Sequence, residues 1–564
     1  MSSTTPTSGT SPVRRLSLTG VLRLRRPSEI WFKPALSSVA AVAPPNLLLL
    51  ALGRLDLAMY TMAGSLCALY AHNRPYAARA RTLAWVVLGM IGGLAVALVT
   101  ASLTRDAVVL VTVGALLAAV QKALCDATRV GPPGNVVLTF ISSAALFVPQ
   151  SLGQIPGHLA LAAAAGVWAW LVGMAPAPVR PHGPERRATA QALNAAAAYA
   201  AAHGTGADED HAPARAAGYA AVQAAWQTLL ALPTTGARAA TRHALERLVV
   251  RAEVALAAPA DTDPERLRAW AHALRGAGRI PRTGDAPADT DELLGVDAEL
   301  AARPAPLWRR LGPLAPIAAR TALGCALAGY ASLALGIGRP YWALVTAAAL
   351  YQANLTLTWS RAVQRVVGNL AGVLLFAAIA PLAHLGQALL VLCCLALNFG
   401  AEALITRNYW LGSVCVTPMA LLVTEFAGYQ ATGDLMTERA VDTVVGALVG
   451  FLAAVVVTNR RAGNRVEQAV TAADRARERA ARLLAEPAPA PGALESARRG
   501  LAVALTDLRA TADGAAGEWW GRALPQERVV LAERSGHRTL AEAVRRQAVR
   551  PDRGAGTRTE DVRP

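Results

Sequence analysis

The chain has 564 residues, of which 54% are hydrophobic and 16% are charged, and its mean hydropathy is +0.34. Soluble proteins carry roughly 25% charged residues, so this composition excludes a soluble multidomain protein and predicts an integral membrane protein. A net charge of +17 would suggest a nucleic-acid partner in a soluble protein. No zinc-finger spacing and no mixed aromatic and basic motif accompanies it here, so we expect no nucleic-acid partner.

A polar and basic N-terminal segment, residues 1–34, precedes the first apolar block and contains no short apolar core with a cleavage site. We therefore expect a cytoplasmic N-terminal segment and an anchoring first block. A membrane-spanning helix needs roughly 17 to 25 apolar residues, and the sequence contains about twelve blocks near that length. They lie near residues 35–53, 57–72, 83–103, 107–122, 135–150, 157–174, 314–337, 339–354, 363–382, 386–404, 409–425 and 439–458.

The blocks form two groups of six, which we expect to be two membrane halves, residues 35–174 and 313–458. Residues 175–312, between the halves, are polar and place apolar residues at helical spacing. Residues 459–564 repeat this style in a helical tail whose end we expect to be disordered. The sequence thus predicts an all-α polytopic membrane protein with about twelve transmembrane helices in two similar six-helix halves and with helical cytoplasmic modules.

Basic residues are distributed unevenly between alternate loops. One set of loops carries two or three each, namely Arg74, Arg79 and Arg81, then Lys122 and Arg129, then Arg361 and Arg365. The intervening loops hold mostly one arginine each, such as Arg54, Arg105, Arg339 and Arg439. Because basic loops stay in the cytoplasm, we expect both termini and the central polar stretch to be cytoplasmic. The expected location is the plasma membrane, which is the cell inner membrane of a bacterium.

The sequence gives no sign of a metal, a cofactor or a catalytic residue. All six cysteines lie in or beside apolar blocks without a CxxC pair. Asp208, Glu209, Asp210 and His211 are adjacent in a Gly-flanked linker and cannot all face one ion, so we interpret them as a solvated loop. The P-loop motif is absent from the sequence, so direct use of ATP would need another subunit.

The two membrane halves resemble each other in sequence. Tyr60, Ala68-Leu69-Tyr70 and Asn73 recur as Tyr341, Ala349-Leu350-Tyr351 and Asn354 at one constant offset. This pattern favours a tandem duplication, and with six helices per half both halves would enter the membrane in the same direction. Small residues four apart let helices approach closely. We expect this helix-packing role for Gly89, Gly93, Gly368, Gly372, Gly446 and Gly450.

The stretch PYWALVTAAALYQANLTLTWSRAVQRVVGNLAGVLLF contains an aromatic pair, a threonine, a polar break, then Arg-x-x-x-Arg-x-x-Gly and a second glycine. The matching residues are Tyr341, Trp342, Thr346, Arg361, Arg365, Gly368 and Gly372. This pattern resembles the signature of the fusaric acid resistance and aromatic acid exporter (FUSC) family, most strongly over residues 313–458. The resemblance implies a transporter that exports aromatic acids. Asn369 replaces the usual threonine, and Ala353-Asn354 replaces a common Pro-Asp, which affects the expected substrate more than the expected fold.

Several polar residues lie inside or beside the apolar blocks of the second half. Because a charged group in hydrocarbon costs several kcal/mol, such residues usually face a bundle interior or a wet cavity. Alternatively, the arginines extend to lipid headgroups and only fix orientation, an interpretation that we favour for Arg361 but not for Arg365, which lies deeper. The predicted substrate path contains Arg320, Tyr341, Trp342, Thr346, Tyr351, Asn354, Arg361, Arg365, Asn369, Asn398 and Glu402.

Three functions compete on this basis. The first is efflux of small organic anions, which are aromatic acids if the resemblance holds. Asp126, Glu402 and Asp442 map near the ends of their blocks, which argues against an obligate carboxylate proton relay. The second is a membrane enzyme, which we do not expect because the external loops are too short for an active site. The third is a non-transporting membrane scaffold whose cytoplasmic helices bind partners. The expected partners are a small organic anion and the lipid bilayer, and the sequence leaves a homo-oligomer open.

Overall fold

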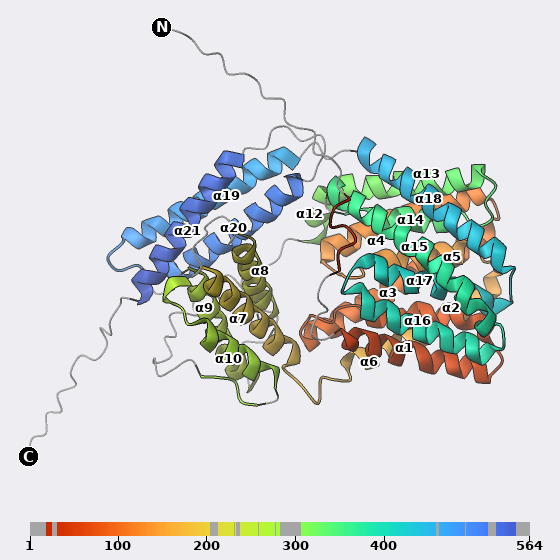
Figure 1. The fold of residues 1–564 in the computed structure, drawn as a ribbon, viewed down its shortest axis with the longest axis horizontal. Coiled ribbons are helices and arrows are strands. Elements are labelled where there is room, and N and C mark those ends of the chain that lie inside the picture. Colours follow the sequence, from red (N-terminus) through yellow and green to blue (C-terminus); the bar gives the residue numbers. More distant parts are fainter. Residues whose placement is uncertain are drawn as a thin grey trace, which may run out of the picture. The chain divides into compact units, whose positions relative to one another are not determined.

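The computed structural model describes residues 18–24, 31–203, 212–229, 232, 237–257, 259–276, 278–282, 306–352, 354–457, 462–490, 492–516 and 526–548. All regular secondary structure in these ranges is helical (Figure 1), which confirms the all-α prediction. The acidic cluster at 208–211 and the end of the tail lie outside the described residues, as does most of the segment 1–34.

The chain divides into two compact units, which are described separately. The membrane unit contains Met1–Pro181 and Ala305–Arg460. The polar unit contains His182–Pro304, Arg461–Ala516 and Gly521–Pro564. Each unit is therefore built from segments that are far apart in the sequence.

The first half of the membrane unit forms six apolar helical segments, two of which begin or end with short 3₁₀ turns. Its elements are α1 (Phe32–Ala51), η1 (Leu55–Leu57), α2 (Ala58–Ser65), η2 (Leu66–Leu69), α3 (Tyr76–Leu103), α4 (Ala107–Thr128), α5 (Val136–Leu146), η3 (Leu152–Gln154) and α6 (Ile155–Met174). The second half contains α12 (Leu307–Leu311), η5 (Gly312–Leu314), α13 (Ala315–Ala334), α14 (Tyr341–Leu350), α15 (Leu355–Ala383), α16 (Gln387–Ile405), α17 (Tyr409–Thr424), η6 (Glu425–Ala427) and α18 (Thr432–Val456).

Nine helices within the described ranges are long and apolar enough to span a membrane. Three shorter apolar segments, Leu55–Leu69, Val136–Leu146 and Tyr341–Leu350, coincide with the second, fifth and eighth expected blocks. A polytopic all-helical membrane protein is thus confirmed. The count of twelve spanning helices stays a prediction, because these three segments fall short of the length that crosses a bilayer alone.

Three helices begin earlier than hydropathy predicts. The first residues of α3, α15 and α18 are Tyr76, Leu355 and Thr432, whereas the expected blocks begin at 83, 363 and 439. A helix makes its backbone hydrogen bonds internally in any solvent, so it continues beyond the apolar stretch that hydropathy detects. Residues near the expected start of a block therefore lie well inside the helix.

Both halves contain the same break between two helical segments, and it lies at the residues of the sequence repeat. A short helical segment ends at Leu69 in the first half and at Leu350 in the second. The next residue is extended in each case, with ψ of 156° at Tyr70 and 111° at Tyr351. A long helix then follows, α3 with 28 residues or α15 with 29. The repeated tyrosine thus marks the same structural break in both halves.

The contacts between the two halves are reciprocal. Helix α1 packs against α16, and α13 packs against α4. Since α1 and α13 are the first helices of their halves and α4 and α16 are the fourth apolar segments, each contact maps onto the other when the halves are exchanged. A pseudo-two-fold relation between the halves produces this pattern.

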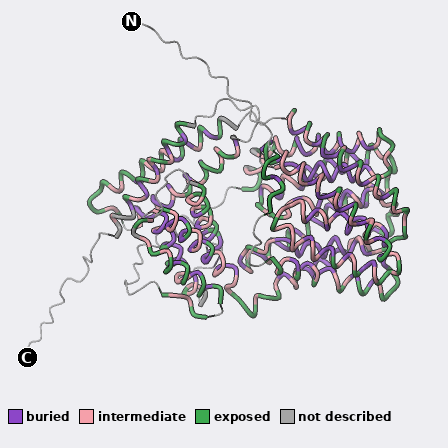
Figure 2. The backbone as a smooth tube through the Cα atoms, viewed as in Figure 1, coloured by how far each residue is buried: buried purple, intermediate pink, exposed green. Residues whose placement is uncertain are grey.

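Large apolar side chains remain exposed along the membrane unit. Trp85, Leu374 and Leu448 keep 73%, 70% and 59% of their surface, and Figure 2 shows exposed and buried positions alternating along these helices. Exposed apolar surface costs about 25 cal/mol per Å² in water. A hydrocarbon environment removes this cost, which agrees with the hydropathy of the same helices.

The polar unit is built from two helical bundles. The first contains α7 (Gly183–His203), α8 (Ala212–Leu229), α9 (Ala237–Ala257), η4 (Pro259–Asp261) and α10 (Pro264–Arg275). The second contains α19 (Ala462–Ala485), α20 (Ala493–Ala516) and α21 (Gln526–Ala548). Each bundle has its own apolar core; on α20, for example, Leu501, Leu505 and Leu508 are buried at helical spacing. Contacts of α8 with α20 and of α9 with α21 join the bundles.

Candidate functional site

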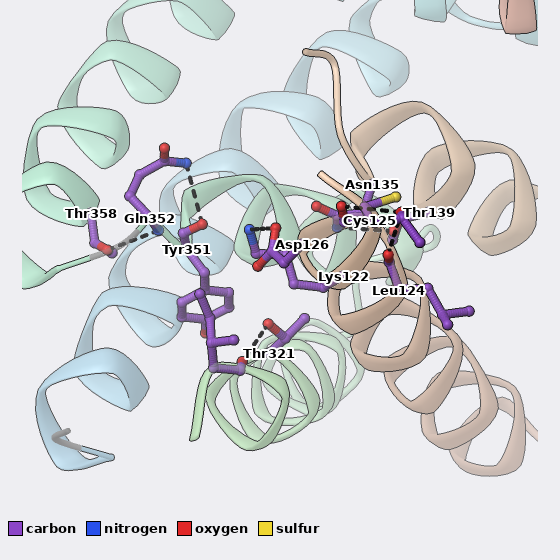
Figure 3. A network of polar contacts seen from close by, with 12 residues as sticks. Lys122, Leu124, Cys125, Asp126, Asn135, Thr139, Thr321, Tyr351, Gln352 and Thr358 are labelled. Carbon is purple, nitrogen blue, oxygen red and sulfur yellow. Dashed lines mark hydrogen bonds and ion pairs between the residues drawn. The ribbon is translucent and has the colours of Figure 1, made fainter. Parts of the chain in front are cut away.

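The break between α14 and α15 is held by its own polar groups. The Asn354 side chain accepts a hydrogen bond from the Leu357 amide at 2.9 Å and so caps the start of α15. Thr358 Oγ1 accepts from the Gln352 amide at 3.2 Å (Figure 3). The Tyr351 hydroxyl donates to the Gly450 carbonyl of α18 at 3.1 Å. Asn354 thus fixes the start of α15, and Tyr351 joins the end of α14 to α18.

Two arginines of α15 meet one tyrosine at the start of α17. Arg361 Cζ lies 3.9 Å from the centre of the Tyr409 ring, and Arg365 Nη1 donates to the Tyr409 hydroxyl at 2.9 Å. Arg365 is 4% exposed, and its Nε is buried without a hydrogen-bond partner among the described residues. Arg365 is ten residues beyond Leu355, which is about 15 Å along the helix. This depth agrees with an interior position for Arg365.

A hydrogen-bonded chain joins three helices one turn beyond Arg365. Asn369 of α15 donates to Thr443 Oγ1 of α18 at 3.1 Å and accepts from Thr417 Oγ1 of α17 at 2.9 Å. Thr443 in turn donates to the Arg439 carbonyl at 2.7 Å. Asn369 and Thr443 are both near the middle of their helices. The amide of Asn369 therefore bonds to both neighbouring helices and fixes the spacing of α15, α17 and α18.

Arg439 of α18 is the most deeply buried cation of this region. It is 1% exposed, and its Cζ lies 4.0 Å from the centre of the Trp342 ring. In the part of the chain that the structure describes, its Nε and Nη1 have no hydrogen-bond partner. Arg365 is within electrostatic reach of Arg439. A buried cation with unsatisfied donors is unfavourable unless an anion binds it, so these two arginines define an anion-binding candidate.

The Tyr341–Trp342 pair connects this region with the other half of the unit. The Trp342 ring centre lies 6.0 Å from that of Phe140 on α5, and the Tyr341 ring centre lies 5.7 Å from that of Phe147, the residue that follows α5. Thr346, one turn further along α14, is buried, and its hydroxyl has no partner among the described residues. The Arg439 guanidinium therefore lies beside an aromatic wall at the interface of the halves.

The position of Asp442 differs from the one that the sequence predicts. It was expected near a helix end, but it is the eleventh residue of α18 and is fully buried. Its Oδ1 accepts from Ser332 of α13 at 2.6 Å, and its Oδ2 has no partner among the described residues. The reason is the early start of α18 at Thr432. An acid does lie in mid-helix, so the argument against a carboxylate proton relay loses its premise.

The remaining residues of the predicted path make other contacts. Arg320 of α13 donates to the Val457 carbonyl at the end of α18. Asn398 of α16 donates to Ser38 of α1 at 2.9 Å, and Glu402 is half-buried one turn further along α16. None of these contacts involves the arginines of α15 and α18. We therefore define the candidate site by Trp342, Arg365, Tyr409, Arg439 and Asp442.

The glycines of the repeated motifs differ in their surroundings. A Cβ on Gly368 would lie 2.5 Å from the Trp410 carbonyl oxygen, and one on Gly446 would lie 2.4 Å from that of Ala343. Cβ atoms on Gly372, Gly450 and Gly93 would lie 2.7, 3.0 and 2.7 Å from neighbouring atoms. Gly89 has open space where a Cβ would be, so no close helix contact requires glycine there.

The apolar helices, their exposed apolar surface and the buried polar interior define a polytopic all-α membrane protein. Residues 326–453, which contain the whole candidate site, match the family described as "Fusaric acid resistance protein-like". Over these residues the chain is similar to the membrane proteins of that family. A stretch of 141 residues is 34% identical to the uncharacterized membrane protein YvaC of Bacillus subtilis (strain 168); it covers 25% of this chain and 22% of that protein. No solved structure matches the chain.

Proposed function

We propose that this protein transports small organic anions and that Arg365 and Arg439 bind the anion. The supporting observation is that both guanidinium groups are buried in the membrane unit and have nitrogen atoms without partners among the described residues. A planar guanidinium pairs with a carboxylate through two parallel hydrogen bonds. If Asp442 is ionised, the three charges leave one net positive charge, which suits a monoanion.

The aromatic wall suggests the class of anion. Trp342 lies against Arg439, and Tyr341 and Phe140 extend this apolar surface. An aromatic acid would place its carboxylate on the arginines and its ring against these side chains, where aromatic pairs add about 0.5–1.5 kcal/mol. The family description, which refers to resistance to an acid, supports the same class.

Export is the direction that the membrane potential favours for an anion. An inside-negative potential supplies about 2.3 kcal/mol per charge per 100 mV. This energy corresponds to a gradient of more than tenfold at about 1.4 kcal/mol per factor of ten. An anion therefore leaves the cytoplasm without a coupled proton, although Asp442 offers a group that a proton-coupled cycle would use.

The proposed location is the plasma membrane, with both termini and the polar unit in the cytoplasm. The distribution of basic loops supports this topology. A cysteine at Tyr429, which is 51% exposed before α18, should react with a membrane-impermeant maleimide in intact cells. A cysteine at Arg268, on exposed surface of α10, should react only after lysis. The reverse labelling pattern would overturn the topology.

A membrane scaffold without transport activity is the second candidate function. The observation in its favour is the size of the polar unit, whose helices α19 to α21 form a separate bundle. A scaffold, however, does not need buried arginines with unsatisfied donors in its membrane unit. We assign no enzymatic reaction to the chain.

Lysine variants of the two α15 arginines test the transport proposal. Arg365→Lys keeps the charge but loses the planar fork, so we expect export of labelled aromatic acids to fall about tenfold, or about 1.4 kcal/mol. Arg361→Lys is the matched control, because a lysine also places its cation over the Tyr409 ring, and it should change export less than twofold. Export is compared at equal protein levels in the membrane. Wild-type export by Arg365→Lys and Arg365→Gln would remove Arg365 from the substrate path.

A further inference from the structure

The polar unit contains a pocket of about 210 Å³ where its two bundles meet. Helices α8 and α9 of the first bundle and α20 and α21 of the second all contribute to its wall. Tyr219 of α8 packs against the cores of both bundles. The pocket is separate from the candidate site in the membrane unit, because every residue that lines it belongs to the polar unit.

The charged groups beside the pocket neutralise one another. Arg498 donates to Glu253 at 2.7 Å and also pairs with Glu495. Arg499 pairs with Glu495 at 2.9 Å, and its Cζ lies 4.3 Å from the centre of the Trp226 ring. The Trp226 indole N–H donates to Glu253 at 2.6 Å. Two arginines and two glutamates, all buried, leave no net charge, so the wall does not favour an ionic ligand.

The rest of the wall is aromatic and aliphatic with a few neutral polar groups. Tyr219 and Trp226 supply the rings, and Gln223, Gln227 and Thr506 supply amide and hydroxyl groups. Burial lowers the pKa of His537, which lies 5.1 Å from Tyr219 between ring centres, to about 3. His537 is therefore uncharged at neutral pH and adds no cation to this end of the unit.

The volume sets the size of a ligand. Atoms fill about three quarters of a protein interior, so about 210 Å³ holds roughly ten to twelve non-hydrogen atoms. We propose that this pocket binds a small uncharged aromatic compound with one hydroxyl or amide group. Because the ligand would contact both bundles, its binding stabilises the attachment of α20 and α21 to α8 and α9.

Binding of 2-naphthol and of 2-naphthoate to the purified full-length protein tests this proposal. The two probes share a ring system and differ in charge, and equilibrium dialysis gives their dissociation constants. We expect 2-naphthol to bind at least tenfold more tightly, because 2-naphthoate would bury a carboxylate against arginines that are already paired with Glu253 and Glu495. Hydrogen exchange should show new protection in α8 and α20 when 2-naphthol is bound.

Phenylalanine substitutions at two alanines of α20 distinguish 2-naphthol binding in the pocket from binding to detergent or to other sites. Ala502 lines the pocket, whereas Ala510 is exposed on the same helix and does not. Ala502→Phe should weaken 2-naphthol binding at least tenfold, and Ala510→Phe should leave it within twofold. Equal or tighter binding of 2-naphthoate overturns the proposal. Saturable 2-naphthol binding that survives Ala502→Phe, no saturable binding to the folded wild-type protein, or protection confined to the membrane unit also overturns it.

Discussion

Replacement of Arg439 by glutamine is expected to lower export of aromatic acids by a factor of roughly 10 to 100. Glutamine keeps a hydrogen-bonding side chain but removes the charge that lies beside Trp342. Hydrogen bonds to charged groups contribute about 1.5–3 kcal/mol, which corresponds to that factor in rate. Arg439→Lys should give an intermediate value, because it keeps the charge and loses the planar fork. Initial export rates in cells with equal amounts of protein measure the effect.

Arg339→Gln is the matched control for this prediction. Arg339 precedes α14 and forms an ion pair with Glu438, next to Arg439 in the sequence, but both side chains are partly exposed. Partly exposed pairs contribute about 0–1 kcal/mol, so export by Arg339→Gln should stay within about fivefold of wild type. If both variants reduce export equally, the effect belongs to helix packing at this end of α18 rather than to anion binding.

Replacement of Glu253 by alanine is expected to destabilise the polar unit by about 3–5 kcal/mol, the cost of breaking a buried ion pair by removing one partner. The variant leaves Arg498 with one carboxylate instead of two, and it leaves the indole N–H of Trp226 without its acceptor. Both groups are buried. The free energy of opening, measured by hydrogen exchange on α8 and α20 in the full-length protein, should fall accordingly.

Asp513→Ala provides the exposed counterpart on α20. Asp513 pairs with Arg509 at 3.2 Å, but their side chains are 63% and 46% exposed. Exposed ion pairs contribute about 0–1 kcal/mol, so this variant should change the opening free energy by less than about 1 kcal/mol. A loss at Glu253→Ala no larger than that at Asp513→Ala would mean that the buried network does not hold the two bundles together.

Hydropathy predicts most of the membrane helices because residues that contact lipid are apolar, and this is visible in the sequence. Each expected block coincides with an apolar helical segment, and the repeated Tyr-containing break occurs in both halves. The reciprocal contacts of α1 with α16 and of α4 with α13 do not follow from hydropathy, because helix neighbours depend on shape and not on overall apolarity. Arg365 was identified from its depth in a block, and its contact with Tyr409 was not.

Arg439 was missed because its block was expected to begin at that residue. The polar residues 432–438 have low hydropathy although they are helical, so Arg439 was assigned to a loop. One signal in the sequence could have identified it. Arg439, Asp442, Gly446 and Gly450 recur at three- and four-residue spacing and therefore share one helical face. Glycines that face a neighbouring helix place the arginine and the aspartate on the buried side of α18.

Flux of labelled aromatic acids through proteoliposomes is the most direct test of anion transport at the buried arginines. A panel of aromatic carboxylates, each with its uncharged amide, is compared in vesicles with wild-type protein, with Arg439→Gln and without protein. We expect at least one carboxylate to cross faster with wild-type protein than without it, to lose this advantage with Arg439→Gln, and to exceed its amide in protein-dependent flux. If every acid crosses at the same rate with wild-type protein and with Arg439→Gln, the account of Arg439 as the anion-binding residue is wrong.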